Sequence, residues 1–217
     1  VKYMIVNEAG ASVYSASELA RQEFPDYQVE ERSAVSIARR LQDPLAELIK
    51  IDPKSIGVGQ YQHDVAQKQL TEELDFVVNT TVNRVGVDVN TASVSLLQHV
   101  SGLTATTAKN LISLRDELGR FEDRRQIKDV KRLGPKTYEQ AIGFLRIVGG
   151  KNPLDQTGIH PESYAVARMI LDRAGLALDA IGSDHAVEAL GALRPAQLAQ
   201  ELEVGQATIV DIIEGLK

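Results

Sequence analysis

Two short stretches in the middle of the chain place a glycine in a tight turn just before a helix. Residues 100–104 read Val-Ser-Gly-Leu-Thr, and residues 130–134, which lie 30 positions later, read Val-Lys-Arg-Leu-Gly. Apolar residues at helical spacing follow both stretches. A helix that begins after such a turn can present free backbone N–H groups and the positive end of its dipole to a phosphate. The pattern predicts two helix-hairpin-helix units; the alternative is a pair of helical hairpins that only pack.

The residues around these turns are basic, whereas the rest of the chain is acidic. Residues 101–151 contain eleven Lys or Arg and six Asp or Glu, a balance of +5, so the remainder must carry −11 to give the total of −6. A basic segment concentrates polyanions, although a solvated helical surface would have the same composition. The candidate phosphate contacts are backbone amides of both turns and four neighbouring cations. They are Gly102, Leu103, Thr104, Ala105, Lys109, Lys131, Arg132, Leu133, Gly134 and Lys136.

No other set of residues has the spacing of an enzyme or metal site. His63, His99, His160 and His185 have no second His or Cys three or four positions away, and the serines lack the setting of an activated nucleophile. Glu8 follows a predicted strand, where a carboxylate could hold Mg²⁺ for phosphodiester chemistry, but such chemistry needs several converging carboxylates. We therefore expect no metal, no cofactor and no catalysis, with Glu8 in solvent.

The elements that position these residues are predicted to be mostly helices. At the start of the chain we expect a strand over residues 2–6 and a second extended stretch over residues 12–14. Ser33 is predicted to cap a helix. Residues 53–64 contain two glycines in a polar run and form the best candidate for a domain boundary.

The basic segment is expected to follow one long amphipathic helix over residues 64–85, capped by Asp64. A helix over residues 92–100 leads into the first turn, and Thr104 begins the next helix. Pro135 occupies the first position of a helix that should run to about residue 147. After a glycine-rich linker, the periodicity predicts four short helices, over residues 161–174, 184–190, 195–202 and 206–216.

Composition limits the class of protein. With 217 residues and 43% hydrophobic content the chain can bury one or two cores, and aromatic residues make up only 5%. Cysteine is absent, which removes disulfides and thiolate metal sites and favours an intracellular, cytoplasmic location. No apolar run approaches the roughly 18 residues of a spanning helix, so no membrane association is expected.

Several long strings closely resemble the bacterial transcription accessory protein Tex family. They are residues 34–48, 51–65, 85–93, 132–137, 143–147, 152–155 and 160–162. The resemblance covers essentially the whole chain. It implies a mainly α fold, with a tandem helix-hairpin-helix and a further small helical domain, preceded by a partial α/β ribonuclease-H-like segment.

The resemblance also implies domain boundaries and a function. Residues 1–63 would be the C-terminal part of a YqgF, ribonuclease-H-like domain, residues 64–150 a linking helix with the tandem helix-hairpin-helix domain, and residues 151–217 a related helical domain. The chain would be a piece of a longer protein that continues into an S1-type RNA-binding domain. Its function would be non-enzymatic, sequence-nonspecific binding of RNA or DNA in a transcription accessory factor.

Two alternatives stay open. The chain could be a scaffold that docks to protein partners such as RNA polymerase or ribosome-associated proteins, or the remnant of a metal-dependent nuclease. The turns also depart from the Gly-hydrophobic-Gly pattern of the family, because each keeps one of the two glycines. A lost glycine restricts close backbone approach, which leaves open that one hairpin serves packing alone.

Overall fold

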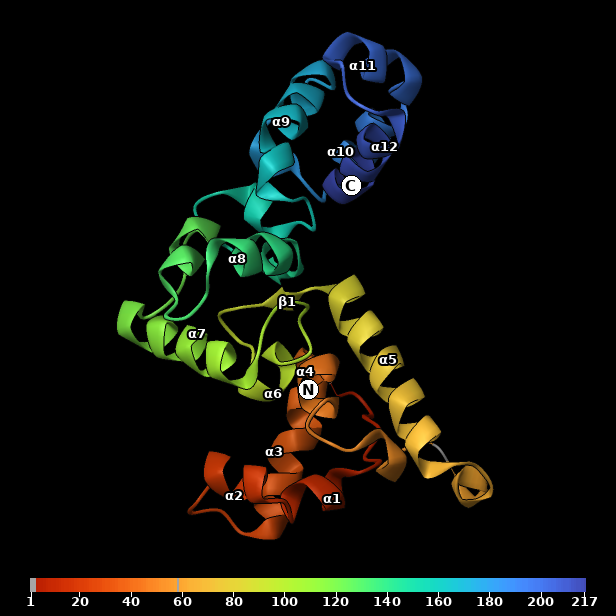
Figure 1. Ribbon diagram of the computed structural model, residues 1–217, viewed down its shortest axis with the longest axis vertical. Coiled ribbons are helices and arrows are strands. Elements are labelled where there is room, and N and C mark those ends of the chain that lie inside the picture. Colours follow the sequence, from red (N-terminus) through yellow and green to blue (C-terminus); the bar gives the residue numbers. More distant parts are fainter. Residues whose placement is uncertain (1–2, 58) are drawn as a thin grey trace. The chain divides into compact units, whose positions relative to one another are not determined.

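In the computed structural model, which describes residues 3–57 and 59–217, the chain divides into two compact units. Unit 1 comprises the residues up to Arg84 together with Ala92–His99, and unit 2 comprises Val85–Thr91 together with Val100–Lys217. Helices dominate both units, which confirms the mainly α fold (Figure 1). The three predicted domains, residues 1–63, 64–150 and 151–217, remain a prediction.

Unit 1 consists of helices and two short 3₁₀ turns. Its elements are α1 (Ala11–Ser15), α2 (Glu18–Glu23), α3 (Val29–Gln42), α4 (Pro44–Leu48), the 3₁₀ turns Pro53–Ser55 and Gln60–Asp64, α5 (Gln67–Val85), whose last residue falls in unit 2, and α6 (Val94–Leu97). Helix α5 is the longest, as predicted, but it begins after Asp64, which lies in the preceding 3₁₀ turn. No described helix is long and apolar enough to cross a lipid bilayer.

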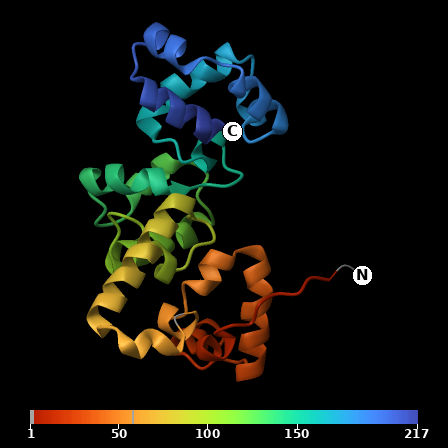
Figure 2. The same cartoon turned by 90° about the vertical axis from the view of Figure 1, so that its right-hand side faces the viewer.

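The extended structure predicted at the start of the chain is wrong for the described residues. Residues 3–6 have no regular secondary structure and pair with no strand, and Tyr3 and Ile5 are 90% and 89% exposed, while Lys2 lies outside the described part. Figure 2 shows this segment running away from the helices of unit 1. Residues 12–14 belong to α1, where Ala11 and Tyr14 are buried three positions apart, a helical and not a strand spacing.

The predicted start of α3 is also wrong. Ser33 lies inside the helix, which begins after Gln28. The Gln28 backbone N–H donates to a Glu31 carboxylate oxygen at 2.7 Å, so a glutamine and a glutamate form the capping box. Ser33, five positions after Gln28, has no terminus to cap, because the N–H groups around it are already bonded within the helix.

Unit 2 contains two short strands, far apart in the sequence, that the sequence analysis missed. Strand β1 (Val87–Asp88) pairs in parallel with β2 (Leu145–Arg146) in the register Val87 to Leu145. The helix expected from Pro135 to residue 147 therefore ends at Ala141 and continues as the 3₁₀ turn Ile142–Phe144. Gly143 weakens the helix, and the buried Leu145 and Ile147 alternate with Arg146, as in a strand.

Between these strands lie the elements that hold the two predicted turns. They are α7 (Ala105–Leu118), the 3₁₀ helix η3 (Arg124–Asp129) and α8 (Pro135–Ala141). Thr104 and Pro135 begin α7 and α8 at the expected positions. Helix α6 before the first turn is shorter than the predicted residues 92–100 and is capped by Ser93.

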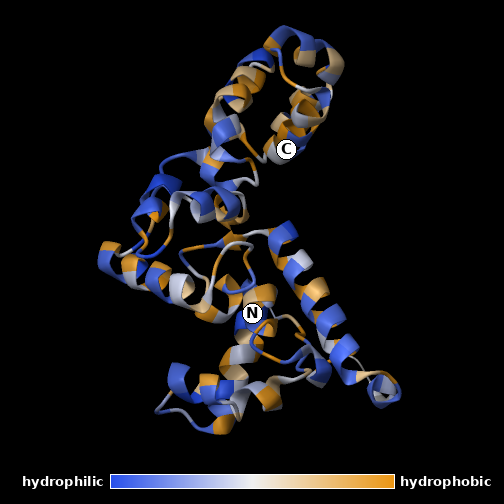
Figure 3. Cartoon of the chain, viewed as in Figure 1, coloured by the Kyte–Doolittle hydropathy of each residue, from blue (hydrophilic) through white to orange (hydrophobic). Residues whose placement is uncertain are grey.

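The C-terminal part of unit 2 is a small bundle whose four helices match the predictions closely. They are α9 (Tyr164–Arg173), preceded by the 3₁₀ turn Pro161–Ser163, α10 (Asp184–Gly191), α11 (Pro195–Leu202) and α12 (Gln206–Leu216). Both views show them gathered together, and hydrophobic residues alternate with hydrophilic ones along each (Figures 2 and 3). Their buried faces enclose one aliphatic core, with Ile170, Leu190 and Ile213 among its members.

Candidate nucleic-acid interface

The two repeated stretches, called turn 1 (residues 100–104) and turn 2 (residues 130–134), have the same backbone hydrogen bond. The Leu103 N–H donates to the Val100 carbonyl at 3.0 Å, and the Leu133 N–H donates to the Val130 carbonyl at 3.1 Å. Both leucine side chains are buried, at 8% and 7% exposure. Leu103 and Leu133 therefore anchor their turns in the core, and only their backbone could face a ligand.

The residue before each leucine adopts the left-handed backbone conformation. Gly102 has φ of 89°, and Arg132, 30 positions later, has φ of 67°. Glycine accepts this conformation freely, whereas a residue with a Cβ pays roughly 1–2 kcal/mol for it. The sequence analysis did not foresee that an arginine occupies the position that a glycine fills in turn 1.

Reciprocal contacts join the two halves of the repeat. The Asn110 side-chain amide donates to the Lys131 carbonyl in turn 2 at 2.8 Å, and the Gln140 amide donates to Ser101 Oγ in turn 1 at 3.0 Å. Both donors and both acceptors are separated by the same 30 positions. Helices α7 and α8 therefore each bind the turn that precedes the other helix, which gives this region an approximate twofold symmetry.

Turn 1 leads into a helix whose start is closed by its own side chains. Thr104 Oγ1 accepts from the Thr107 N–H at 3.3 Å, and the Thr104 N–H donates to Thr107 Oγ1 at 2.8 Å. Two of the amide groups that could have met a phosphate are thereby occupied. Gly102 also faces the protein itself, because a Cβ added there would lie 3.3 Å from the Gln140 side chain.

Turn 2 leads into a helix whose start is open. Gly134 is the N-cap and offers no side chain, and Pro135 has no N–H to satisfy. The N–H groups of Gly134, Lys136 and Thr137 have no acceptor among the residues that the structure describes. A Cβ added at Gly134 would meet no atom within 4 Å, so a ligand can reach these donors.

Three exposed cations surround the open start of α8. Lys131, Arg132 and Lys136 are exposed, and within the described part of the chain none of them forms an ion pair. The equivalent positions around turn 1 hold the uncharged Ser101, Gly102 and Thr106.

The remaining predicted contacts are less concentrated. Thr104 and Ala105 are exposed at the start of α7. Lys109 is exposed on the same helix, next to the Asn110 that binds turn 2. The structure therefore gathers half of the predicted residues, Lys131 to Gly134 and Lys136, at one tip.

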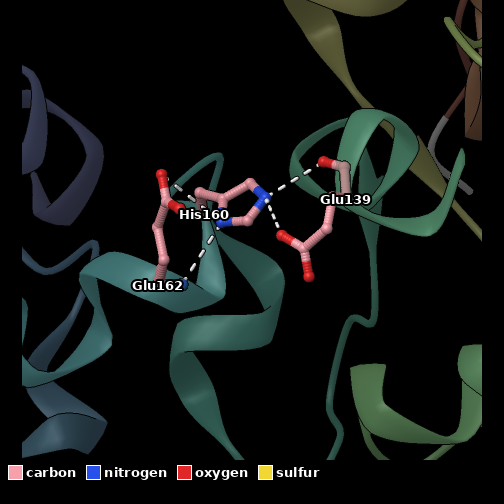
Figure 4. A group of neighbouring side chains, drawn as sticks. All are labelled: Glu139, His160 and Glu162. Atoms are coloured by element: carbon pink, nitrogen blue, oxygen red, sulfur yellow. Dashed lines mark hydrogen bonds and ion pairs between the residues drawn. The ribbon is translucent and has the colours of Figure 1, made fainter. Parts of the chain in front are cut away.

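One group of potential metal ligands escaped the sequence analysis. Glu139 on α8, His160 and Glu162 have ligand atoms within 4.8 Å of one another (Figure 4). His160 Nδ1 accepts from the Glu162 N–H at 3.2 Å, and Nε2 lies 3.0 Å from the Glu139 carbonyl, to which it can donate. Both ring nitrogens have partners, so this histidine caps the turn before α9 and ties it to α8. The separation of 21 positions between Glu139 and His160 hides this contact from any local pattern.

The other acidic candidate is isolated. Glu8 is exposed, and only the one group that contains His160 assembles three potential ligands within the described residues. In unit 1 a groove of about 500 Å³ is lined mainly by aliphatic side chains of α4 and α5, with His99 at one side. Burial lowers the pKa of His99 below its ordinary value. None of the predicted phosphate-binding residues lines this groove.

Comparison with known proteins places this geometry in a class. Residues 82–146 match the helix-hairpin-helix motif, residues 152–217 match the HHH domain, and residues 1–42 match the Tex protein YqgF-like domain. The reciprocal turns of unit 2 are therefore those of a helix-hairpin-helix protein.

Relatives identify the family within that class. The chain is 61% identical to the uncharacterized protein YdcI of Bacillus subtilis, with 100% of the chain and 30% of the relative covered. It is 55% identical to the transcriptional accessory protein Tex of Neisseria gonorrhoeae (99% and 28% covered) and 41% identical to the human S1 RNA-binding domain-containing protein 1 (100% and 27%). The chain belongs to the Tex family, and it spans about 30% or less of the length of these relatives.

Proposed function

We propose that the chain binds nucleic acid without sequence preference as part of a transcription accessory factor, and that turn 2 makes the principal contact. The observation that carries the proposal is the open start of α8 with Lys131, Arg132 and Lys136 around it. The helix-hairpin-helix matches and the relatives named for transcription and for RNA binding support it.

The chemistry of turn 2 suits phosphate and not bases. Backbone N–H groups at a helix start and exposed cations bind phosphate oxygens, which are the same at every nucleotide. Reading a base requires side chains that reach its edge with a fixed pattern of donors and acceptors. The contacts proposed here are amides of Gly134, Lys136 and Thr137 with three flexible cations, so they distinguish no sequence.

Turn 1 has a supporting role in this proposal. Its Leu103 anchors the backbone, its Thr104 closes the start of α7, and its Gly102 packs against Gln140. Ala105 and Lys109 remain exposed and add contacts at the edge of the interface. The chain is proposed to act by binding alone. Phosphodiester cleavage by a bound metal needs several converging carboxylates, and Glu8 belongs to no such group among the described residues.

A salt titration tests the proposal. The unmodified chain is titrated with single-stranded RNA and with duplex DNA, each of two unrelated sequences and matched length, at several salt concentrations. Two to four phosphate contacts predict a slope of log affinity against log salt of about −2 to −4 on duplex DNA, and a shallower slope on single strands. Affinity that differs strongly between the two sequences, or that does not change with salt, would overturn it.

A further inference from the structure

A second cationic site lies beside α8, in a cavity that no predicted residue lines. The cavity has a volume of about 430 Å³ and lies within unit 2. Its walls come from η3, α8, the segment after β2 and α9, and include Arg125, Tyr138, Lys151, Asn152, Tyr164 and Arg168. Segments more than 40 positions apart in the sequence thus meet around one hollow.

Cations from three separate elements converge on this cavity. Arg125, Lys151 and Arg168 are all exposed at its wall. Arg125 is paired with Asp123 at 2.8 Å, and its hydrogen bond holds the pKa of the Asp123 carboxyl below its ordinary value. Lys151 and Arg168 form no ion pair with any residue that the structure describes. Two positive charges therefore line the cavity without a direct ion pair.

The wall behind these cations is also positive. Arg124 is 1% exposed, and its guanidinium donates to the carbonyls of Leu145, Ile159 and Thr157 at 2.8, 2.7 and 2.6 Å. Carbonyl oxygens accept these hydrogen bonds, and the buried Asp155 carboxylate, which accepts from the Arg124 backbone N–H at 3.0 Å, lies beside it.

Two tyrosines complete the lining, and their hydroxyls donate within the protein, to Asp155 and to the Arg124 carbonyl. The Tyr164 hydroxyl accepts from Arg124 at 2.7 Å and donates to the buried Asp155 at 2.6 Å, which fixes its orientation. Burial raises the pKa of Tyr138 to about 12, so its hydroxyl keeps its proton near neutral pH. Four Arg or Lys and two Asp line the cavity, a formal balance of +2. This positive balance matches a phosphate group.

We propose that this cavity binds a phosphate group of the same nucleic-acid strand that turn 2 holds. The inference rests on the proposed function, because it assigns a further contact to that strand. Tyr138 joins the two sites: its N–H donates to the Gly134 carbonyl at 2.9 Å, and its ring lines the cavity. Gly134 and Tyr138 are therefore one helical turn apart, roughly 5–6 Å along the axis, so α8 contributes to both sites.

The double variant K151Q/R168Q tests the cavity. Both side chains are exposed and unpaired within the described part of the chain, so neutralising them should leave the thermal unfolding midpoint unchanged. Affinity for a duplex oligonucleotide should fall about 3- to 10-fold, and the salt slope should become less steep by about 1 to 2. The control K68Q/R194Q removes one lysine and one arginine that are exposed and do not line the cavity, and it should bind like the unmodified chain. Lys68 forms an exposed ion pair with Glu72 at 3.8 Å, which contributes little to stability.

The outcomes separate the cavity from turn 2. If K131E/R132E/K136E weakens binding but K151Q/R168Q does not, the cavity assignment is overturned and the proposed function stands. If neither variant weakens binding, both are overturned. A loss confined to K151Q/R168Q supports the cavity and overturns the role of turn 2.

A titration with inorganic phosphate tests whether the cavity binds a nucleic-acid strand or a free anion. Inorganic phosphate and the oligonucleotide are each titrated into the unmodified chain and into K151Q/R168Q. If the double variant loses affinity for inorganic phosphate but keeps its full affinity for the oligonucleotide, the cavity is a small-anion site and the path of the strand is overturned.

Discussion

Turn 1 and turn 2 have the same hydrogen bond, the same buried leucine and the same contact from the opposite helix, yet they present different surfaces. In turn 1 a glycine takes the left-handed position and a threonine closes the helix start. In turn 2 an arginine takes the left-handed position and a glycine leaves the helix start open. Under the proposed function, the glycine that lies two positions later in turn 2 leaves the helix start open for a phosphate, whereas turn 1 serves packing.

The two turns also differ in the charges around them. The three positions that carry Lys131, Arg132 and Lys136 in turn 2 carry no charge in turn 1. Because packing requires the symmetric contacts of Asn110 and Gln140 and not these side chains, both turns keep the fold while one of them is free to specialise.

The glycines of the two turns should respond very differently to the same substitution. Gly102→Val places a β-branched residue at φ of 89° and against Gln140, which should destabilise unit 2 by about 2 kcal/mol or more. Gly134→Val, at φ of −72° with open space around it, should cost under about 1 kcal/mol. Chemical denaturation of both variants measures this difference. Equal losses of stability would break the comparison.

The left-handed arginine of turn 2 gives a test in which stability and binding change in opposite directions. Arg132→Gly relieves the backbone strain at φ of 67° and should stabilise unit 2 by about 1 kcal/mol. The same change removes one phosphate contact, so the salt slope should become less steep by about 0.9. Denaturation and oligonucleotide titration on one sample measure both effects. Arg132→Lys, which keeps the charge and the strain, is the control.

The threonine N-cap that follows turn 1 can be introduced at the equivalent position of turn 2. Gly134→Thr would recreate the closed helix start of turn 1, because Thr137 stands three positions later just as Thr107 follows Thr104. We expect a gain in stability of a few tenths of a kcal/mol and weaker oligonucleotide binding, since the added hydroxyl occupies an amide. Gly134→Ala is the control: it adds a Cβ without a hydroxyl, so it separates the effect of the capping hydrogen bond from the effect of side-chain size. Binding unchanged in Gly134→Thr would show that these amides do not contact phosphate.

The smallest expected effect is a dependence on pH at His99, the last residue of unit 1, which directly precedes turn 1 in the sequence. The pKa of His99 in the folded chain is lowered from the ordinary value of 6.5 by burial, while Asp75 opposes the shift. The unfolded chain therefore takes up the proton first, so the contribution of His99 to stability is present above pH 6.5 and is lost as the pH falls. Denaturation at pH 7.5 and 5.5 should show a larger loss for the unmodified chain than for His99→Gln. Equal losses would assign the dependence to other groups.

The sequence predicted helix bounds correctly where a proline or capping residue within the helix's own stretch marks its start. Pro195 and Pro135 begin their helices as expected, and α11 and α12 have the predicted bounds. The start of α3 was missed because a Gln28 and Glu31 capping box is a rarer pattern than a serine cap. The strands β1 and β2 were missed because each has two residues and exists only through its partner 58 positions away.

In the candidate site, too, local features could be predicted from the sequence and features that depend on distant residues could not. The turns were recognisable because the repeat lies within 30 positions and each turn is local. The left-handed Arg132 and the closed helix start at Thr104 depend on backbone angles and on a partner that the sequence pattern does not fix. Arg168 lies outside the basic segment, and only the packing of α9 brings it to the cavity that Arg125 lines.

The most direct test of the account compares K131E/R132E/K136E with a variant of equal charge, K68E/R84E/R194E, whose three sites are exposed and lie outside both turns. Both are titrated with duplex DNA and with single-stranded RNA over a range of salt, after circular dichroism has confirmed that they are folded. We predict that the turn 2 variant binds roughly 30- to 100-fold more weakly on all sequences alike, with a slope less steep by about 2 to 3, while the control binds nearly as the unmodified chain does. A folded turn 2 variant that binds as tightly as the unmodified chain would contradict the account and leave both hairpins as packing elements.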